Sequence, residues 1–278
     1  MEFFVFTDID GTLLNHNNYS YGDLKKFIKK IKSSVHIIFN TSKTFSEIKN
    51  IQKQLDLNFP FIAENGACIF FPDGYLSENL LNKKFFKYKK SIGYKLTKLE
   101  PKLLPEKLHT LRNKYNFSFL SELNDKQIVK ITNLDCDSLK NAKKRLFTNP
   151  IYWNDSKEKI PEFKSEINFL KEDFCLLEGG RFLHISDNYN KGSALKKFLS
   201  IIEKSCSSKF TTVSLGDSEN DLSMLESTDY SCIVKGENRK ISLKKKNNIY
   251  YSETKASEGW QDSFEFFFEM EDSYFCYF

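Results

Sequence analysis

A short apolar run near the start of the chain stops at two closely spaced carboxylates, and this feature constrains the fold most. Residues 3–7 are apolar and favour β-structure, and Asp8, Asp10 and Gly11 follow them. Such a run predicts a strand buried on both faces, as in a parallel sheet. Ligands bind beyond the carboxyl ends of such strands, and two carboxylates there favour a hard cation such as Mg²⁺. Taken alone, the stretch also fits a strand followed by an ordinary Asp-Gly turn.

Two further apolar runs end in turns with reactive side chains. Residues 35–39 precede Thr41, Ser42 and Lys43, and residues 210–215 precede a turn with several acids. Segments with helical periodicity lie between the runs, which predicts βαβ steps and parallel strands. The three turns would then lie along one edge of the sheet. We expect one cleft to hold Asp8, Asp10, Thr41, Ser42, Lys43, Asp217 and Asp221, together with Lys191 if it opens its helix there.

The remaining core segments follow from local patterns. Glu64-Asn65-Gly66 lies between apolar runs at 59–63 and 67–71, which is a strong hairpin signal. Residues 230–234 predict another strand. Helices are expected over 21–32, 45–57, 191–204 and 257–268, the last with Trp260, Phe264 and Phe267 packed inward.

The pattern changes between residues 84 and 187, where lysine-rich segments carry isolated runs. β-like runs occur at 127–132, 174–177 and 181–186, and helical stretches at 105–115 and 138–147. We therefore expect an α/β protein with a Rossmann-like doubly wound parallel sheet core and an inserted α+β cap domain. The expected core parts are 1–83 and 188–278, and the expected cap is 84–187.

Composition limits the possible partners. Hydrophobic residues make up 40% of the 278 residues, but no apolar run reaches the roughly 18 residues of a membrane span. Asp8 and Asp10 interrupt any signal-peptide pattern, and the scattered cysteines suggest reduced thiols, so we expect a cytoplasmic protein. The net charge is +5, but only residues 240–246 form a lysine cluster, without interleaved aromatics. We expect neither nucleic acid nor membrane as a partner.

The sequence resembles the haloacid dehalogenase superfamily of phosphohydrolases. Its four motifs match Asp8-Ile9-Asp10-Gly11-Thr12-Leu13, Thr41, Lys191 and Gly216-Asp217-Ser218-Glu219-Asn220-Asp221, in that order. The long insertion between the second motif and Lys191 is similar to the large α/β cap of type IIB members. The resemblance implies a Mg²⁺-dependent phosphomonoesterase that acts on a small phosphorylated sugar derivative.

Within that resemblance, each motif residue has an expected role. Asp8 is the expected nucleophile, forming an aspartyl-phosphate, and Asp10 the general acid and then base. Mg²⁺ is expected on Asp8, the carbonyl of Asp10, and Asp217, with Asp221 as a ligand or supporting residue. The expected phosphate-binding residues are Thr41, Ser42 and Lys191.

A narrower resemblance is to mannosyl-3-phosphoglycerate phosphatases. It covers residues 40–44, 64–67, 142–150, 179–184 and Gly259-Trp260, although Asn149 stands where that family often carries an acid. It implies mannosyl-3-phosphoglycerate or its glucosyl analogue as substrate. Arg181 is the preferred ligand for the glycerate carboxylate, because a guanidinium forms a bidentate fork, and strict strand alternation puts His184 on the opposite face. The expected substrate-binding residues are Lys43, Asn65, Arg181, His184 and Asn220.

Three alternatives remain open from the sequence. The chain could be a generic sugar-phosphate phosphatase, or a phosphotransferase similar to phosphomannomutases if water is kept from the aspartyl-phosphate. It could also be a non-catalytic binding module on the same fold. The sequence does not predict an oligomeric state.

Overall fold

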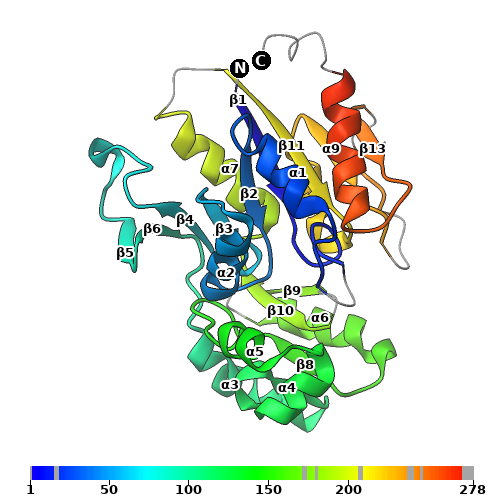
Figure 1. The fold of residues 1–278 in the computed structure, drawn as a ribbon. Helices are drawn as coiled ribbons and strands as arrows, with labels where there is room; N and C mark the ends of the chain where they lie inside the picture. Colours follow the sequence, from blue (N-terminus) through cyan, green and yellow to red (C-terminus); the bar gives the residue numbers. More distant parts are fainter. Residues whose placement is uncertain are drawn as a thin grey trace.

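The computed structural model describes residues 2–15, 19–170, 174–178, 181–205, 209–236, 241–244 and 247–270, with side chains described as far as residue 267. Two sheets organise these residues. The larger has nine strands in the order β13-β12-β11-β1-β2-β3-β4-β6-β5, and the smaller has four in the order β7-β8-β10-β9. Figure 1 shows the larger sheet above the smaller one, which belongs to the inserted segment.

Strand β1 (Glu2–Thr7) lies at the centre of the parallel part of the large sheet. It pairs with β2 (His36–Asn40) on one side and β11 (Phe210–Gly216) on the other, both parallel. The parallel part continues through β3 (Phe61–Ala63), β12 (Tyr230–Ile233) and β13 (Ile249–Tyr251). This confirms the expected doubly wound α/β core and brings the ends of β1, β2 and β11 to the edge that faces the insertion (Figure 1).

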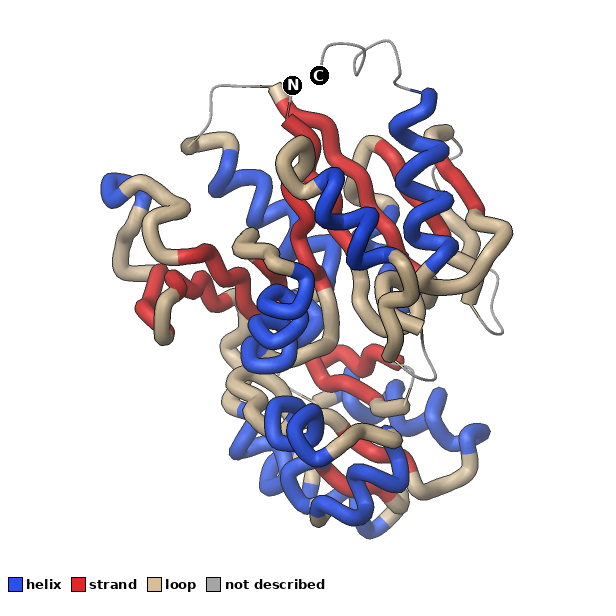
Figure 2. Tube along the Cα trace, viewed as in Figure 1, coloured by secondary structure: helices blue, strands red, loops and turns tan. Residues whose placement is uncertain are grey.

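Helices cover both faces of this sheet (Figure 2). Phe3 and Val5 pack into the cluster that includes α1 (Leu24–Ile31), α2 (Phe45–Leu55) and α9 (Glu258–Met270). Phe4 and Phe6 point to the other face and pack on α7 (Lys191–Ile202). Because successive side chains of β1 point to opposite faces and helices cover both, residues 3–6 are all buried and all apolar. In α9, Trp260, Phe264 and Phe267 are buried, as expected.

The other end of the large sheet is antiparallel. The expected hairpin is confirmed, because β3 pairs with β4 (Cys68–Pro72) around the turn Glu64–Gly66. The sheet then continues through β6 (Ser91–Lys95) and β5 (Phe85–Tyr88), both beyond residue 84, where we expected the cap to begin. Pairing with β4 holds these strands in the core sheet. We therefore propose that the insertion spans 96–187 and that the core resumes at 188.

The inserted segment is an α+β domain with an antiparallel sheet, here called the cap. Its strands are β7 (Phe117–Phe119), β8 (Ile151–Trp153), β9 (Phe174–Glu178) and β10 (Leu183–Asp187). Its helices are α3 (Leu104–Lys107), α4 (Asp125–Thr132), α5 (Cys136–Ala142) and α6 (Ile160–Phe169). Strands β9 and β10 confirm two of the three expected runs.

Three expectations for the cap need correction. Residues 127–132 form most of α4, because a capping box between Asn124 and Gln127 starts a helix there. The helix expected over 138–147 ends at Ala142, since the following backbone turns to bind Glu64. The stretch 105–115 is a short α3 followed by the 3₁₀ segment His109–Asn113. In the first two cases local capping or a distant contact outweighed the apolar pattern.

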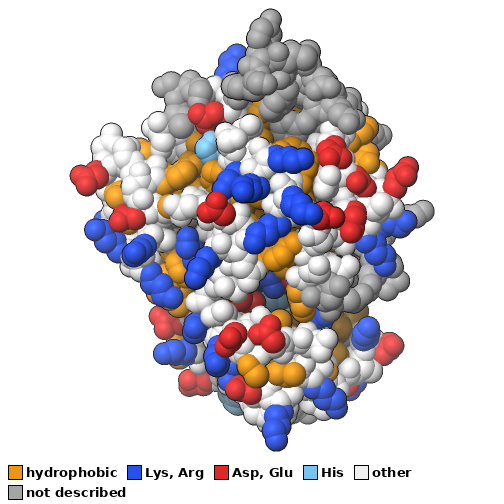
Figure 3. All heavy atoms as spheres, viewed as in Figure 1, with side chains coloured by type: hydrophobic (Ala, Val, Ile, Leu, Met, Phe, Trp, Pro, Cys, Tyr) orange, Lys and Arg blue, Asp and Glu red, His pale blue; other side chains and the backbone are white. Residues whose placement is uncertain are grey.

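Among the described residues, no helix is long and apolar enough to cross a membrane. On the face shown in Figure 3, lysine and arginine side chains are interspersed with acidic ones, and the surface is hollowed between core and cap. Lys240, Lys245 and Lys246 of the lysine cluster lie outside the described residues.

Candidate active site

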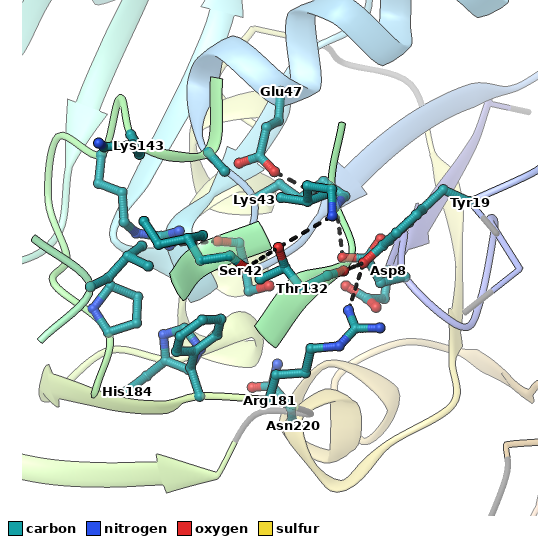
Figure 4. Close-up of a pocket in the computed structure, with 18 of the residues that line it drawn as sticks. Asp8, Tyr19, Ser42, Lys43, Glu47, Thr132, Lys143, Arg181, His184 and Asn220 are labelled. Carbon is teal, nitrogen blue, oxygen red and sulfur yellow. Dashed lines mark hydrogen bonds and ion pairs between the residues drawn. The ribbon is translucent and has the colours of Figure 1, made fainter. Parts of the chain in front are cut away.

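A pocket between core and cap collects the side chains that follow the parallel strands. Asp8 and Asp10 follow β1, Ser42 and Lys43 follow β2, and Asp217 follows β11. Figure 4 shows side chains from both domains around the pocket, with Asp8 and Lys43 from the core and Arg181 and His184 from the cap. Further lining residues are Tyr19, Glu47, Leu120, Ile128, Thr132, Leu134, Ala142, Lys143, Arg145, Pro150, Arg181, Phe182, His184, Ser218 and Asn220.

Lys191 joins two of the acids beneath this pocket. Asn190 caps α7 through Ser193, which places Lys191 in the first turn of the helix. The Nζ atom lies 2.6 Å from Oδ1 of Asp8 and 2.6 Å from Oδ1 of Asp221. Burial lowers the pKa of Lys191, but the charges of Asp221 and Asp8 outweigh it and hold that pKa above its ordinary value. Lys191 is therefore a fixed cation beside Asp8.

Asp221 organises the turn after β11. Its Oδ2 accepts hydrogen bonds from the backbone N–H groups of Asp217 and Ser218, each at 3.1 Å, and from the Ser218 hydroxyl at 3.0 Å. Its Oδ1 accepts from Lys191. Both oxygens of this fully buried carboxylate are thus engaged by the protein itself.

Three carboxylates lie close enough to share a cation. Asp8, Asp217 and Asp221 each offer an oxygen within 4.8 Å of the others. Burial, with repulsion from Asp221 and Asp8, raises the pKa of Asp217 well above its ordinary value. Burial also raises the pKa of Asp8 to about 6, against the opposing charge of Lys191. A divalent cation would relieve this repulsion, so the donor set fits Mg²⁺.

Gly11 allows the close approach that this cluster needs. Its φ is +85°, and a Cβ there would lie 2.5 Å from Oδ2 of Asp217. The next residue, Thr12, donates a 2.9 Å hydrogen bond from its hydroxyl to Oδ1 of Asp217. The turn after β1 therefore positions the acid that follows β11.

Asp10 lies apart from the three-carboxylate group and pairs with Lys43. Their Oδ2 and Nζ atoms are 2.8 Å apart, and Glu47 lies 3.7 Å from the same ammonium. The other oxygen, Oδ1 of Asp10, is buried and has no hydrogen-bond partner among the described residues. Lys43 thus has two carboxylates to balance its charge, whereas Asp10 keeps one oxygen free.

The remaining core residues of the prediction support the loops. Thr41 is buried and is not among the lining residues, and its hydroxyl accepts a long 3.4 Å hydrogen bond from the backbone N–H of Lys43. Asn220 lines the pocket and donates a 3.0 Å bond to Oδ1 of Asn65. The Nδ2 of Asn65 is buried without a partner among the described residues. Asn65 therefore ties the β3–β4 turn to the turn after β11.

Arg181 reaches the pocket from the segment just before β10. Its Nη1 donates a 2.6 Å hydrogen bond to the hydroxyl of Tyr19, and its guanidinium lies 5.8 Å from the centroid of that ring. The Tyr19 hydroxyl donates in turn to the carbonyl of Thr132 in the cap. Within the described part of the chain, no carboxylate forms an ion pair with Arg181. The preceding Gly179 and Gly180 lie outside the described residues.

His184 lines the same pocket as Arg181, which strict alternation did not predict. Because β10 begins only at Leu183, Arg181 precedes the strand and the alternation does not extend to it. His184 is 7% exposed, and its Nδ1 has no hydrogen-bond partner among the described residues. Burial lowers its pKa to about 3, and the charges of Arg145 and Lys191 act in the same direction. The imidazole is therefore neutral at physiological pH.

Comparison with known proteins identifies the family. A family model described as haloacid dehalogenase-like hydrolase matches residues 5–266.

The chain belongs to the haloacid dehalogenase-like hydrolases.

Among curated proteins, the chain is 33% identical over 263 residues to a protein of Persephonella marina. That protein is named glucosyl-3-phosphoglycerate/mannosyl-3-phosphoglycerate phosphatase, and the match covers 93% of this chain and 94% of the relative.

Solved structures of this hydrolase fold match nearly the whole chain. A crystal structure from Thermoplasma acidophilum has a TM-score of 0.65 at 16% identity and covers 96% of this chain and 98% of its own. The sucrose-phosphatase of Synechocystis, solved with sucrose and phosphate, has a TM-score of 0.64 at 12% identity, with coverages of 96% and 98%. At these identities the matches establish the fold.

Sequence reasoning missed two residues that join the cap of this hydrolase to its core. The fully buried carboxylate of Glu64 accepts from the backbone N–H groups of Leu146, Phe147 and Thr148 at 2.8–3.1 Å, and from the Thr148 hydroxyl at 2.6 Å. Arg145 donates to the carbonyl of Ser42 at 2.7 Å. The one available signal for Arg145 was its place in 142–150, a segment of the narrower resemblance.

Proposed function

We propose that this chain, a phosphoric monoester hydrolase, removes phosphate from mannosyl-3-phosphoglycerate or glucosyl-3-phosphoglycerate with Mg²⁺ and an Asp8 nucleophile. The observation that carries the proposal is the position of Asp8. Its Oδ1 is fixed by Lys191, its Oδ2 has no hydrogen-bond donor among the described residues, and the residue lines the pocket. The similarity to the Persephonella marina phosphatase supports the substrate.

The first chemical step forms a bond between Oδ2 of Asp8 and phosphorus. The bond from phosphorus to the glycerate oxygen breaks, and Asp10 gives that oxygen a proton. The free, buried Oδ1 of Asp10 supports this assignment, because its other oxygen is held by Lys43. Lys191 holds the other oxygen of the same carboxylate, and its charge offsets the negative charge of the phosphoryl group.

The second step returns the enzyme to its starting state. Asp10 takes a proton from water as the water oxygen attacks phosphorus. The bond from phosphorus to Asp8 breaks, so phosphate leaves and Asp8 is a carboxylate again. Thr41 and Ser42, together with the backbone amides that open α2, are the proposed phosphate-binding groups besides Lys191.

Asp8, Asp217 and the backbone carbonyl of Asp10 are the proposed ligands of Mg²⁺. When bound, the ion supplies positive charge that neutralises the phosphoryl oxygens and the three carboxylates around it. Asp221 acts by holding the backbone of Asp217 and Ser218 in place, because both of its oxygens already have donors.

The glycerate carboxylate is assigned to Arg181. A carboxylate needs an unmatched cation, and Lys43 already faces Asp10 and Glu47. Among the described residues, the side chain of Arg181 has a polar contact with Tyr19 alone. It lines the pocket from the cap side. Its guanidinium can form the paired hydrogen bonds that a carboxylate accepts.

A phosphate-release assay on a substrate panel tests the function. The purified chain with Mg²⁺ is given both hexosyl-3-phosphoglycerates, 3-phosphoglycerate and hexose 6-phosphates, and chelator is added to a parallel set. We expect the highest kcat/KM on a hexosyl-3-phosphoglycerate and loss of activity in chelator. A preference for hexose phosphates would leave a generic sugar phosphatase, and phosphate transfer to a sugar in place of water would indicate a mutase. Absence of turnover on every ester would indicate a binding module.

A further inference from the structure

We propose that Arg145, Phe182 and His184 form a subsite for the neutral hexose of the substrate at the cap end of the pocket. The inference rests on the proposed function and deepens it, because it assigns the part of the substrate that neither the phosphate nor the carboxylate site holds. In the view of Figure 4, Asp8, Arg181 and His184 follow one another across the pocket. In the substrate, the carboxylate and the hexose branch from the carbon next to the phosphorylated one, so Arg181 and His184 can each receive one branch while Asp8 faces the phosphate.

His184 supplies a hydrogen-bonding group that lacks a partner in the protein. The side chain is 93% buried, and its Nδ1 faces no donor or acceptor among the described residues although the residue lines the pocket. A buried polar atom without a partner costs free energy, which a ligand group recovers when it binds. Because burial lowers the pKa of His184 to about 3, the ring is neutral and suits a hydroxyl group as donor or acceptor.

Arg145 supplies hydrogen-bond donors, and a carboxylate of the protein already balances its positive charge. Its Nε lies 3.8 Å from the buried carboxylate of Glu64 and donates to the Thr148 hydroxyl, while Nη2 donates to Ser42. Its Nη1 has no acceptor among the described residues. Since Glu64 balances the charge of Arg145, this guanidinium differs from that of Arg181, which has no carboxylate partner in the described structure. An anionic group therefore prefers Arg181, and a neutral hydroxyl group suits Arg145.

Phe182 and its neighbours supply the apolar part of the subsite. Phe182 lies between Arg181 and His184 in the sequence, lines the pocket and is partly buried. Its ring packs on Tyr152 at a centroid distance of 6.1 Å, which fixes its orientation. Leu120, Ile128 and Pro150 line the same pocket. Hexose rings present C–H surfaces as well as hydroxyls, so a mixed wall of apolar groups and a few polar atoms fits them.

Two substrates that differ only in the hexose test the subsite. We compare kcat/KM on glucosyl-3-phosphoglycerate with kcat/KM on 3-phosphoglycerate for the wild type, His184→Leu, His184→Asn and Phe182→Ala. His109→Leu is the matched control, because His109 is an exposed cap histidine bonded to the carbonyl of Glu106. We expect the ratio of the two constants to fall about 10-fold in His184→Leu, the cost of one lost hydrogen bond to a hydroxyl.

The conservative variant separates recognition from packing. The amide of Asn can donate or accept near the position of Nδ1, so His184→Asn should recover most of the ratio that His184→Leu loses. Phe182→Ala should lower the ratio as well, and His109→Leu should leave it at the wild-type value. Equal losses on both substrates in the His184 and Phe182 variants would overturn the hexose subsite and leave the proposed function standing. If the wild type has equal kcat/KM on glucosyl-3-phosphoglycerate and 3-phosphoglycerate, both the hexose subsite and the proposed function would be overturned.

Discussion

Lys191 and Asp221 form an ion pair that is almost wholly removed from water. Their Nζ and Oδ1 atoms are 2.6 Å apart, and the two side chains are 1% and 0% exposed. The second oxygen of Asp221 holds three donors in the turn that carries Asp217. The same acid thus fixes both the cation beside the nucleophile and the loop of a proposed metal ligand.

The two acids after β11 should respond differently to loss of charge. We expect Asp217→Asn to weaken Mg²⁺ binding more than Asp221→Asn. Asp217 has a carboxylate oxygen available to bind the ion, whereas both oxygens of Asp221 already accept hydrogen bonds. We expect Asp221→Asn to lower the free energy of unfolding more, by about 3 kcal/mol, because it removes one partner of a buried ion pair. Magnesium titration and thermal unfolding of both variants measure the two effects. The reverse order in magnesium affinity would exchange the two roles.

Arg181→Ala should lose activity only where the substrate carries a carboxylate. We expect kcat/KM on glucosyl-3-phosphoglycerate to fall by an amount equivalent to about 2–4 kcal/mol for a lost charged contact. The loss on p-nitrophenyl phosphate should be small. Arg112→Ala, which removes a surface arginine paired with Glu122, is the control. Equal losses on both esters would reject the glycerate assignment.

Glu64→Gln should loosen the attachment of the cap. In Gln, an NH₂ group takes the place of one carboxylate oxygen. Because that oxygen accepts backbone N–H groups and NH₂ cannot, buried N–H groups of residues 146–148 lose their acceptor. We expect a destabilisation of about 3 kcal/mol from this buried site. Thermal unfolding measures it, with Glu162→Gln as the control because Glu162 is largely exposed and paired with Lys114. Similar melting temperatures for the two variants would contradict a structural role for Glu64.

His184 should make the fold sensitive to acid. Its pKa falls from 6.5 to about 3 on burial, so between these values the unfolded chain binds a proton that the folded chain does not. Stability from this group is therefore constant above pH 6.5 and declines as the pH falls below it, by about 2 kcal/mol at pH 5. Unfolding in urea at pH 7.5 and 5 should show a smaller acid loss in His184→Asn. An identical loss in both proteins would contradict the buried neutral imidazole.

The sequence predicted the core and the strand ends well, because the physics there is local. Apolar runs that stop at Asp8, Thr41 and Asp217 require buried strands, and parallel strands bring their ends together. The start of α7 at Lys191 likewise follows from the Asn190 cap. Local capping also explains α4, where the apolar run at 127–132 had wrongly predicted a strand.

Other errors and omissions concern contacts between residues far apart in the chain. Glu64 binds Leu146 across 82 positions, and no pattern near either residue announces that contact. The pairing of β6 with β4, on which the proposed start of the cap at residue 96 rests, is set by a partner strand in the same way. His184 joined Arg181 in the pocket because β10 starts late, a boundary that periodicity does not resolve.

Asp8→Asn tests the central claim most directly. The substitution keeps the size of the side chain, and Lys191 retains Asp221 as a partner, so the fold should persist. Thermal unfolding verifies that point, and phosphate release with Mg²⁺ on the preferred substrate measures turnover, with the exposed Asp23→Asn as the control. We predict that kcat falls by roughly a thousandfold or more, because a neutral amide cannot form the aspartyl-phosphate. A folded Asp8→Asn protein that keeps substantial activity would contradict covalent catalysis through Asp8.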